Sequence, residues 1–147
     1  MTTPTAADDK KQIGLTLAGS KALARLMSEG LFTIEGDAYK FGIAYAVARG
    51  IDPNDAPDSG YGTKFNATGG LDREGLVRDL LRVLNIGDAA RPYATAERLA
   101  EVGLTALVRR IEAHESLAEI LQEVEQEAGD ANESVEQDEV AEYGNGP

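Results

Sequence analysis

Aliphatic residues recur at helical spacing in successive segments of this 147-residue chain, and glycine or proline stands at most of the borders between segments. We expect a first helix that is capped by Gly19 or Ser20 and ends at Gly30, and a second helix that ends at Gly50. The pattern predicts about five helices, over roughly residues 20–30, 38–50, 72–84, 92–111 and 117–124.

The expected core is aliphatic. Hydrophobic residues make up 42% of the chain but aromatic residues only 5%, and tryptophan is absent, a composition typical of helical packing. The third helix is expected to bury four leucines, Leu76, Leu80, Leu81 and Leu84. The absence of cysteine excludes disulfides, thiolate catalysis and cysteine-based zinc sites.

Residues 10–17 alternate between apolar and polar side chains, which predicts one short strand before the first helix. Its aliphatic face contains Ile13, Leu15 and Leu17, and its polar face contains Gln12, Gly14 and Thr16. Residues 52–70 are rich in Pro, Gly, Asn and Asp and are expected to form a long loop. The expected fold is therefore mostly α, a compact helical domain over residues 10–127 with one N-terminal strand.

Charge is distributed unevenly along the chain. All 14 Lys and Arg residues stand at or before Arg110, while 12 of the 26 acidic residues follow that position, so the net charge of −12 belongs to the C-terminal part. We expect a disordered leader over residues 1–9 and a disordered acidic tail over residues 128–147. Because no signal peptide or membrane-spanning apolar run is present, we expect a cytoplasmic protein without a membrane partner.

No motif predicts catalysis, a metal site or a cofactor. His114 is the only histidine and has no nucleophile motif around it. The glycines of "GYGTKFNATGG" lack the Gly-Lys-Ser/Thr ending of a phosphate-binding loop. "DPNDAPDSG" lacks the glycine and glutamate that a calcium loop needs at its sixth and twelfth positions. The sequence therefore predicts a non-enzymatic binding protein.

A strand followed by two helices is the order of elements in ribbon–helix–helix proteins, in which the strands of two chains pair and enter the DNA major groove. A short edge strand packed on the same helices is the alternative. Glu35 and Asp37 count against groove binding, because carboxylates at the start of the second helix repel phosphate.

The segments "LTLAGSKALARLMSEG", "AYKFGIAYAVARGI", "KFNATGGLD" and "AERLAEVGLTALVRRI" resemble, by order of elements, the small DndE-type proteins of bacterial DNA-sulfur-modification (Dnd) clusters. The resemblance covers roughly residues 12–111 and includes an internal glycine of the last helix, Gly103. It implies a mostly helical homo-oligomer that contacts the backbone of double-stranded DNA through lysines, with protein partners from an anti-phage defence system. This chain departs from that pattern because it has only five lysines.

The residues expected to contact DNA are Lys10, Lys11, Gln12, Thr16, Lys21, Lys64, Arg73, Arg78 and Arg82. For the three arginines, an ordinary solvated helix surface is the alternative. The alternative function is a protein–protein adaptor or regulator, in which the helix at Leu117–Val124 docks on a partner and the acidic tail binds a basic surface or imitates DNA.

Overall fold

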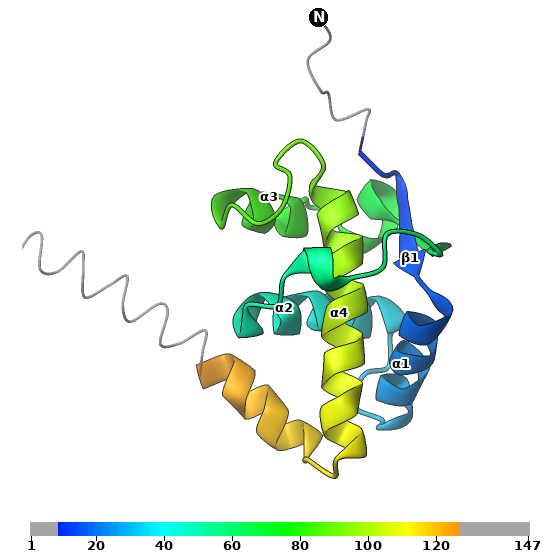
Figure 1. The fold of residues 1–147 in the computed structure, drawn as a ribbon, viewed down its shortest axis with the longest axis vertical. Helices are drawn as coiled ribbons and strands as arrows, with labels where there is room; N and C mark the ends of the chain where they lie inside the picture. The colour runs from blue at the N-terminus through cyan, green and yellow to red at the C-terminus, as the bar shows by residue number, and fades with distance from the viewer. Residues whose placement is uncertain (1–8, 127–147) are drawn as a thin grey trace, which may run out of the picture. The chain divides into compact units, whose positions relative to one another are not determined.

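The computed structural model describes residues 9–126, which are mostly helical and include a short two-stranded antiparallel sheet (Figure 1). The elements are β1 (Gln12–Leu15), α1 (Leu17–Ser28), α2 (Glu35–Arg49), the 3₁₀ turn η2 (Pro53–Asp55), β2 (Gly62–Asn66), the π-helical turn η3 (Ala67–Leu71), α3 (Leu76–Val83) and α4 (Pro92–Glu112). A further helix covers residues 117–126. The predicted mostly helical fold is confirmed.

The chain divides into two compact units, one up to Arg109 and one from Arg110. The predicted single domain over residues 10–127 stays a prediction, and the predicted tail over residues 128–147 lies outside the described residues. Residues 1–8 of the predicted leader also lie outside them. Asp9 does not belong to a leader, because its carboxylate accepts the N–H groups of Tyr93 and Ala94 at 2.8 and 3.0 Å and so caps α4.

Several predicted helix boundaries are confirmed. The second helix is capped at Gly50, whose φ of 66° is the left-handed conformation that glycine adopts most readily, and α4 begins at Pro92. The predicted cap of the first helix is wrong. Thr16 is the N-cap, since its Oγ1 accepts the N–H of Gly19 at 3.2 Å, and the helix starts at Leu17.

The segment expected to be a long loop contains β2, which pairs antiparallel with β1. The register joins Gln12 to Asn66 and Leu15 to Gly62, with an irregularity between Ile13 and Gly14. The predicted alternation ends early, because Leu17 has left the strand and its side chain is 74% exposed. An antiparallel partner from the same chain is the long-range contact that the alternation alone did not identify.

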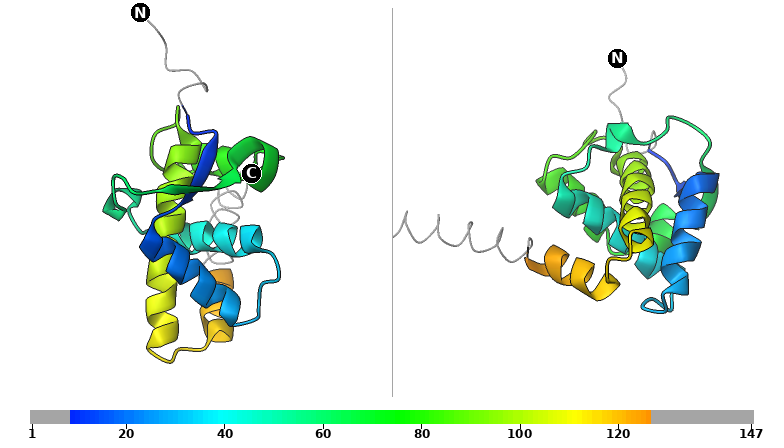
Figure 2. Two further views of the ribbon diagram at one scale, coloured as in Figure 1. Left: turned by 90° about the vertical axis from the view of Figure 1, so that its right-hand side faces the viewer. Right: turned by 60° about the horizontal axis from the view of Figure 1, so that its bottom comes forward.

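Helices α2 and α4 cross steeply and form the centre of the first unit (Figures 1 and 2). A Cβ atom on Gly103 would lie 1.9 Å from the carbonyl oxygen of Gly42, so the two backbones approach at this point as closely as glycine permits. Tyr39, Leu99 and Leu104 are fully buried around the crossing elements. Much of the aliphatic core that the sequence predicts is therefore contributed by these two helices.

The burial predicted for the third helix is mostly wrong. Helix α3 starts at Leu76 rather than near Asp72, and only Leu81 among the four leucines is buried. The side chains of Leu76, Leu80 and Leu84 are 66%, 46% and 47% exposed. An eight-residue helix that touches the rest of its unit along a narrow strip buries fewer side chains than its aliphatic content suggests.

Within the second unit, Arg110 donates hydrogen bonds to Glu115 at 2.9 Å and to Glu123 at 2.7 Å. The helix over residues 117–126 follows Ser116, as the capping-box motif predicts. In the part of the chain that the structure describes, no helix is both long and apolar enough to cross a lipid bilayer.

Candidate nucleic-acid interface

Two buried glutamates of α4 hold the N-terminal segment in place. The N–H of Gly14 donates to Glu97 Oε2 at 2.8 Å, and the N–H of Thr16 donates to Glu101 Oε1 at 3.0 Å. Thr16 Oγ1 also donates to Glu101 Oε2 at 2.7 Å, and Lys10 forms an ion pair with Glu97. Each carboxylate is thereby paired with hydrogen-bond donors, as a buried charge requires.

These contacts occupy the edge of β1 that does not face β2. The carbonyl of Gly14 on this edge accepts the Tyr39 hydroxyl at 2.9 Å, and burial together with Glu97 and Glu101 raises the pKa of Tyr39 well above its usual value. One edge of β1 is thus paired with β2, and Gly14 and Thr16 on the other edge are engaged by α4 and α2. The strand–helix–helix order is present, and β1 pairs within its own chain, as in the alternative of a short strand packed on the same helices.

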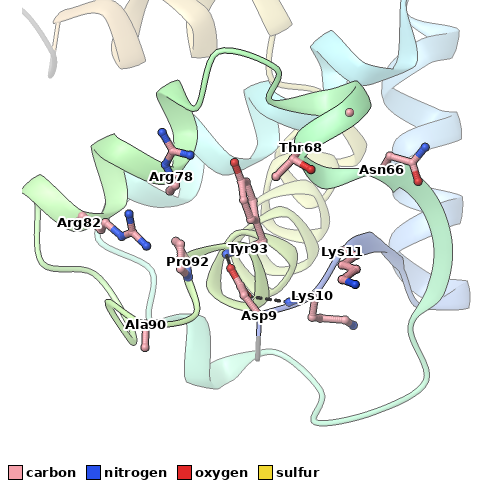
Figure 3. Close-up of a pocket in the computed structure, with 11 residues that line it drawn as sticks. Asp9, Lys10, Lys11, Asn66, Thr68, Arg78, Arg82, Ala90, Pro92 and Tyr93 are labelled. Carbon is pink, nitrogen blue, oxygen red and sulfur yellow. Dashed lines mark hydrogen bonds between the residues drawn. The ribbon is translucent and has the colours of Figure 1, made fainter. Parts of the chain in front are cut away.

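A cavity of about 460 Å³ collects four of the predicted DNA-contacting cations in the first unit. Lys10 and Lys11 come from the segment before β1, while Arg78 and Arg82 come from α3 on the other side (Figure 3). We call this cavity the basic pocket. Its lining also includes the polar side chains of Asn66, Thr68 and Tyr93, which are hydrogen-bonding groups.

The acidic groups at the basic pocket are engaged by the fold. Asp9 is the one acidic residue among the described residues that line the pocket, and it caps α4. Nearby Asp72 accepts the N–H groups of Val77 and Arg78 at 3.0 and 3.1 Å and the Tyr93 hydroxyl at 2.9 Å. Burial, with the hydrogen bond to Asp72 second, raises the pKa of Tyr93 to about 12, so this phenol stays protonated at neutral pH.

The cations of the basic pocket differ in how far they are already paired. Arg78 lies 3.0 Å from Asp79, whose hydrogen bond raises the pKa of the guanidinium, and Lys10 is paired with Glu97. Arg82 donates from Nε to the Ala89 carbonyl at 3.1 Å, which leaves its two terminal NH₂ groups without a carboxylate among the described residues. Lys11 is exposed and has no ion pair in residues 9–126.

A second cavity of about 700 Å³ shares Asp9, Lys10, Lys11 and Asn66 with the basic pocket. It is also lined by Gln12, Tyr61 and Glu97, the last of which is paired with Lys10, and we call it the tyrosine pocket. The ammonium of Lys10 lies 5.5 Å from the centroid of the Tyr61 ring, within cation–π distance. Burial of Tyr61, followed by the charge of Glu101, raises its pKa to about 12.

The structure separates the other predicted contact residues from the basic pocket. The Thr16 hydroxyl is engaged by Glu101 and Gly19, so it does not present a free group to a base. Lys64 pairs with Glu35 at 3.1 Å, and Arg73 donates to the Gly69 carbonyl at 3.1 Å. Lys21 is exposed on α1, outside both pockets.

Sequence reasoning missed the polar groups that complete the basic pocket. Asn66 and Thr68 lie in the segment that was expected to be a loop, and Tyr93 is in the first turn of α4. The "Pro-Tyr" pair at the start of a predicted helix was a signal for the position of Tyr93, but no local pattern links it to residues 66–68. Pairing of β1 with β2, together with the hydrogen bond of Asp9 to the N–H of Tyr93, brings these segments together.

In residues 9–126 no group of three or more His, Asp or Glu side chains is arranged to hold a metal ion. Searches with protein-family models, curated proteins and solved structures found no match to this chain.

Proposed function

We propose that this protein is a non-enzymatic DNA-associated accessory protein that holds phosphate groups of the DNA backbone in the basic pocket. The observation that carries the proposal is the gathering of Lys10, Lys11, Arg78 and Arg82 around one cavity, although the unit as a whole is close to neutral. Local positive charge, rather than net charge, determines where a polyanion binds.

The donors of the basic pocket suit a phosphate group. Arg82 offers a planar pair of terminal NH₂ groups, and Lys11 offers a compact point charge. Neutral donors, such as the Asn66 amide and the Thr68 hydroxyl, add hydrogen bonds without sequence preference. Such contacts position DNA rather than read its bases, which agrees with an accessory role.

The proposal predicts salt-dependent binding that weakens when Lys11 is reversed in charge. A labelled duplex, titrated at several salt concentrations and followed by fluorescence anisotropy, should bind with a log-affinity slope of several units. The Lys11→Glu variant should reduce that slope by about 1 and weaken binding at every DNA sequence.

Lys40→Glu is the matched control, because Lys40 is on α2 and lines neither pocket. It makes the same change in net charge and should leave binding closer to that of the unchanged protein. Equal losses in the two variants, or no binding of duplex at low salt, would contradict the proposal. The second result would favour the adaptor alternative.

The resemblance to DndE-type proteins supports a place for this accessory protein in a DNA-phosphorothioation and anti-phage defence system of the cytoplasm, as a homo-oligomer with partners from that system. Genes for DNA-sulfur-modification enzymes beside the gene for this chain would support that setting. The molar mass of the purified protein, measured by light scattering, tests whether it is a homo-oligomer. A monomeric mass would contradict that part of the proposal.

A further inference from the structure

We propose that the basic pocket and the tyrosine pocket together bind a dinucleotide-length piece of unpaired DNA. The inference rests on the proposed function and goes further, because it names an unpaired rather than a duplex backbone as the preferred ligand. It starts from the position of the two cavities, which share Asp9, Lys10, Lys11 and Asn66 and therefore adjoin.

The volumes of the cavities fit this ligand. They measure about 460 and 700 Å³, which falls within the range of about 300–1,000 Å³ that is usual for small-molecule sites, and both are open to solvent, the tyrosine pocket more than the basic pocket. Phosphates of an intact duplex lie on a convex surface and need only a flat basic patch. Adjoining concave sites instead admit the sugar and base of a strand that is free to bend into them.

The chemistry changes along the path from one cavity to the other. Arg78 and Arg82 stand at one end, Lys10 and Lys11 lie at the junction, and the half-buried ring of Tyr61 lines the far cavity. A row of cations that leads to an aromatic ring is the arrangement by which proteins bind single strands, with phosphates on the cations and a base packed on the ring. The side chains in Figure 3 give the cationic part of this path.

The polar groups of the tyrosine pocket match the edge of an unpaired base. Gln12 is exposed on β1, and its Oε1 lies 3.5 Å from the hydroxyl of Thr63 on the neighbouring strand. These two side chains, with Asn66, supply both donors and acceptors beside the ring of Tyr61. In a duplex those base edges are occupied by the complementary strand.

The test compares three labelled ligands with the full-length protein at low salt: an oligothymidylate of about twelve nucleotides, a duplex of the same length, and the dinucleotide of two thymidines. We expect the single strand to bind about tenfold or more tightly than the duplex. Tyr61→Ala should weaken single-strand binding by about tenfold, because the stacking of one base on one aromatic ring contributes an affinity of this size.

Tyr61→Phe is the conservative control. It keeps the ring, loses only the hydroxyl that donates to the Pro57 carbonyl, and should bind the single strand as the unchanged protein does. If Tyr61→Ala disturbs folding, Gln12→Ala provides a second variant in the same pocket at an exposed strand position and should weaken the single strand but not the duplex.

The outcomes distinguish the inference from the proposed function. Duplex binding that equals or exceeds single-strand binding overturns the inference and leaves the proposed function standing, whereas failure of both ligands overturns both. Single-strand binding that is indifferent to Tyr61→Ala and Gln12→Ala also overturns the inference. Because the two pockets together hold about two nucleotides, the free dinucleotide should bind nearly as tightly as the longer strand, and much weaker binding of the dinucleotide would overturn the proposed length of the site.

Discussion

At the scale of single residues, the most constrained side chains are the buried carboxylates of Glu97 and Glu101. Both side chains are nearly inaccessible, and each accepts an N–H group from the first strand or from the helix cap that follows it. The pair fixes the course of the chain from Lys10 to Thr16. Because Lys10 and Lys11 line both pockets, the geometry of the candidate site depends on these two acids.

Replacement of Glu97 by glutamine should destabilise the fold by about 2 kcal/mol, because the amide keeps the size but loses the charge that pairs with Lys10 and presents a donor where an acceptor is needed. Chemical denaturation measures the effect. Glu112→Gln is the control, since Glu112 is an exposed residue of the same helix and its change should stay within about 0.5 kcal/mol of the unchanged protein. Equal stability of the two variants would show that the buried hydrogen bonds contribute little.

At the scale of elements, the crossing of α2 and α4 determines the shape of the first unit. Gly42 and Gly103 allow the two helices to touch backbone to backbone, and a side chain on either glycine would meet atoms of the other helix closer than van der Waals contact. Gly103 is an internal glycine of α4. The close approach of the Gly42 carbonyl explains why glycine rather than alanine stands at position 103, because alanine is otherwise the more favourable residue inside a helix.

Gly103→Ala should therefore cost about 3 kcal/mol or more in unfolding free energy, because the new methyl would overlap the Gly42 carbonyl oxygen. Gly36→Ala is the matched control on α2: there a Cβ meets its nearest atom at 3.6 Å, an ordinary contact. This control should remain within about 0.5 kcal/mol of the unchanged protein. Thermal or chemical unfolding of the two variants measures the difference, and a Gly103→Ala protein of normal stability would contradict the close crossing.

At the scale of the whole molecule, the distribution of charge should limit the affinity of the proposed DNA binding. The bases all lie at or before Arg110, and the acids that follow give the full chain its net charge of −12. Local cations attract phosphate at short range, while distant acids of the same chain repel it over about a Debye length. We therefore expect the full chain to bind DNA less tightly at low salt than it would without the acidic residues that follow Arg110.

Removal of residues 128–147 takes away six acids and no base, which changes the formal net charge from −12 to −6. The shortened protein should bind duplex DNA more tightly at low salt, and the difference should fade as salt screens the acids. A full-length variant with the same six acids changed to amides is the control for chain length. It should match the shortened protein if charge is the cause; unchanged or weaker binding on truncation would contradict the repulsive role of the tail.

The sequence predicted most elements because their signals are local. Helical spacing, Gly50 after the second helix and Pro92 at the start of the fourth are patterns within one or two turns, and the structure confirms them. The prediction of which α3 side chains are buried failed because burial is not decided by local signals. Leucines at helical spacing indicate an apolar face, but whether anything covers Leu76 and Leu80 depends on elements far away in the chain.

Four cations of the candidate site were named from the sequence, yet nothing in it indicated which of the nine predicted residues lie together. Lys11 is brought to the cavity by the β1–β2 pair and the Asp9 cap on α4, while Arg82 comes from α3, which follows Asp72, the acceptor of the Tyr93 hydroxyl of α4. Thr16 was predicted to face outward, and the hydrogen bond to Glu101, 85 residues away, turned it to a structural role.

By itself, then, the sequence determined the helical class, some helix ends such as Gly50 and Pro92, and the segregation of charge, because these depend on neighbouring residues and on composition. Only the tertiary structure decided that the first strand pairs within its own chain and that two basic segments face one pocket. Those features arise from contacts between residues some 50 to 90 positions apart, such as Gln12 with Asn66 and Lys10 with Glu97, whose free energy is gained only when the whole unit folds.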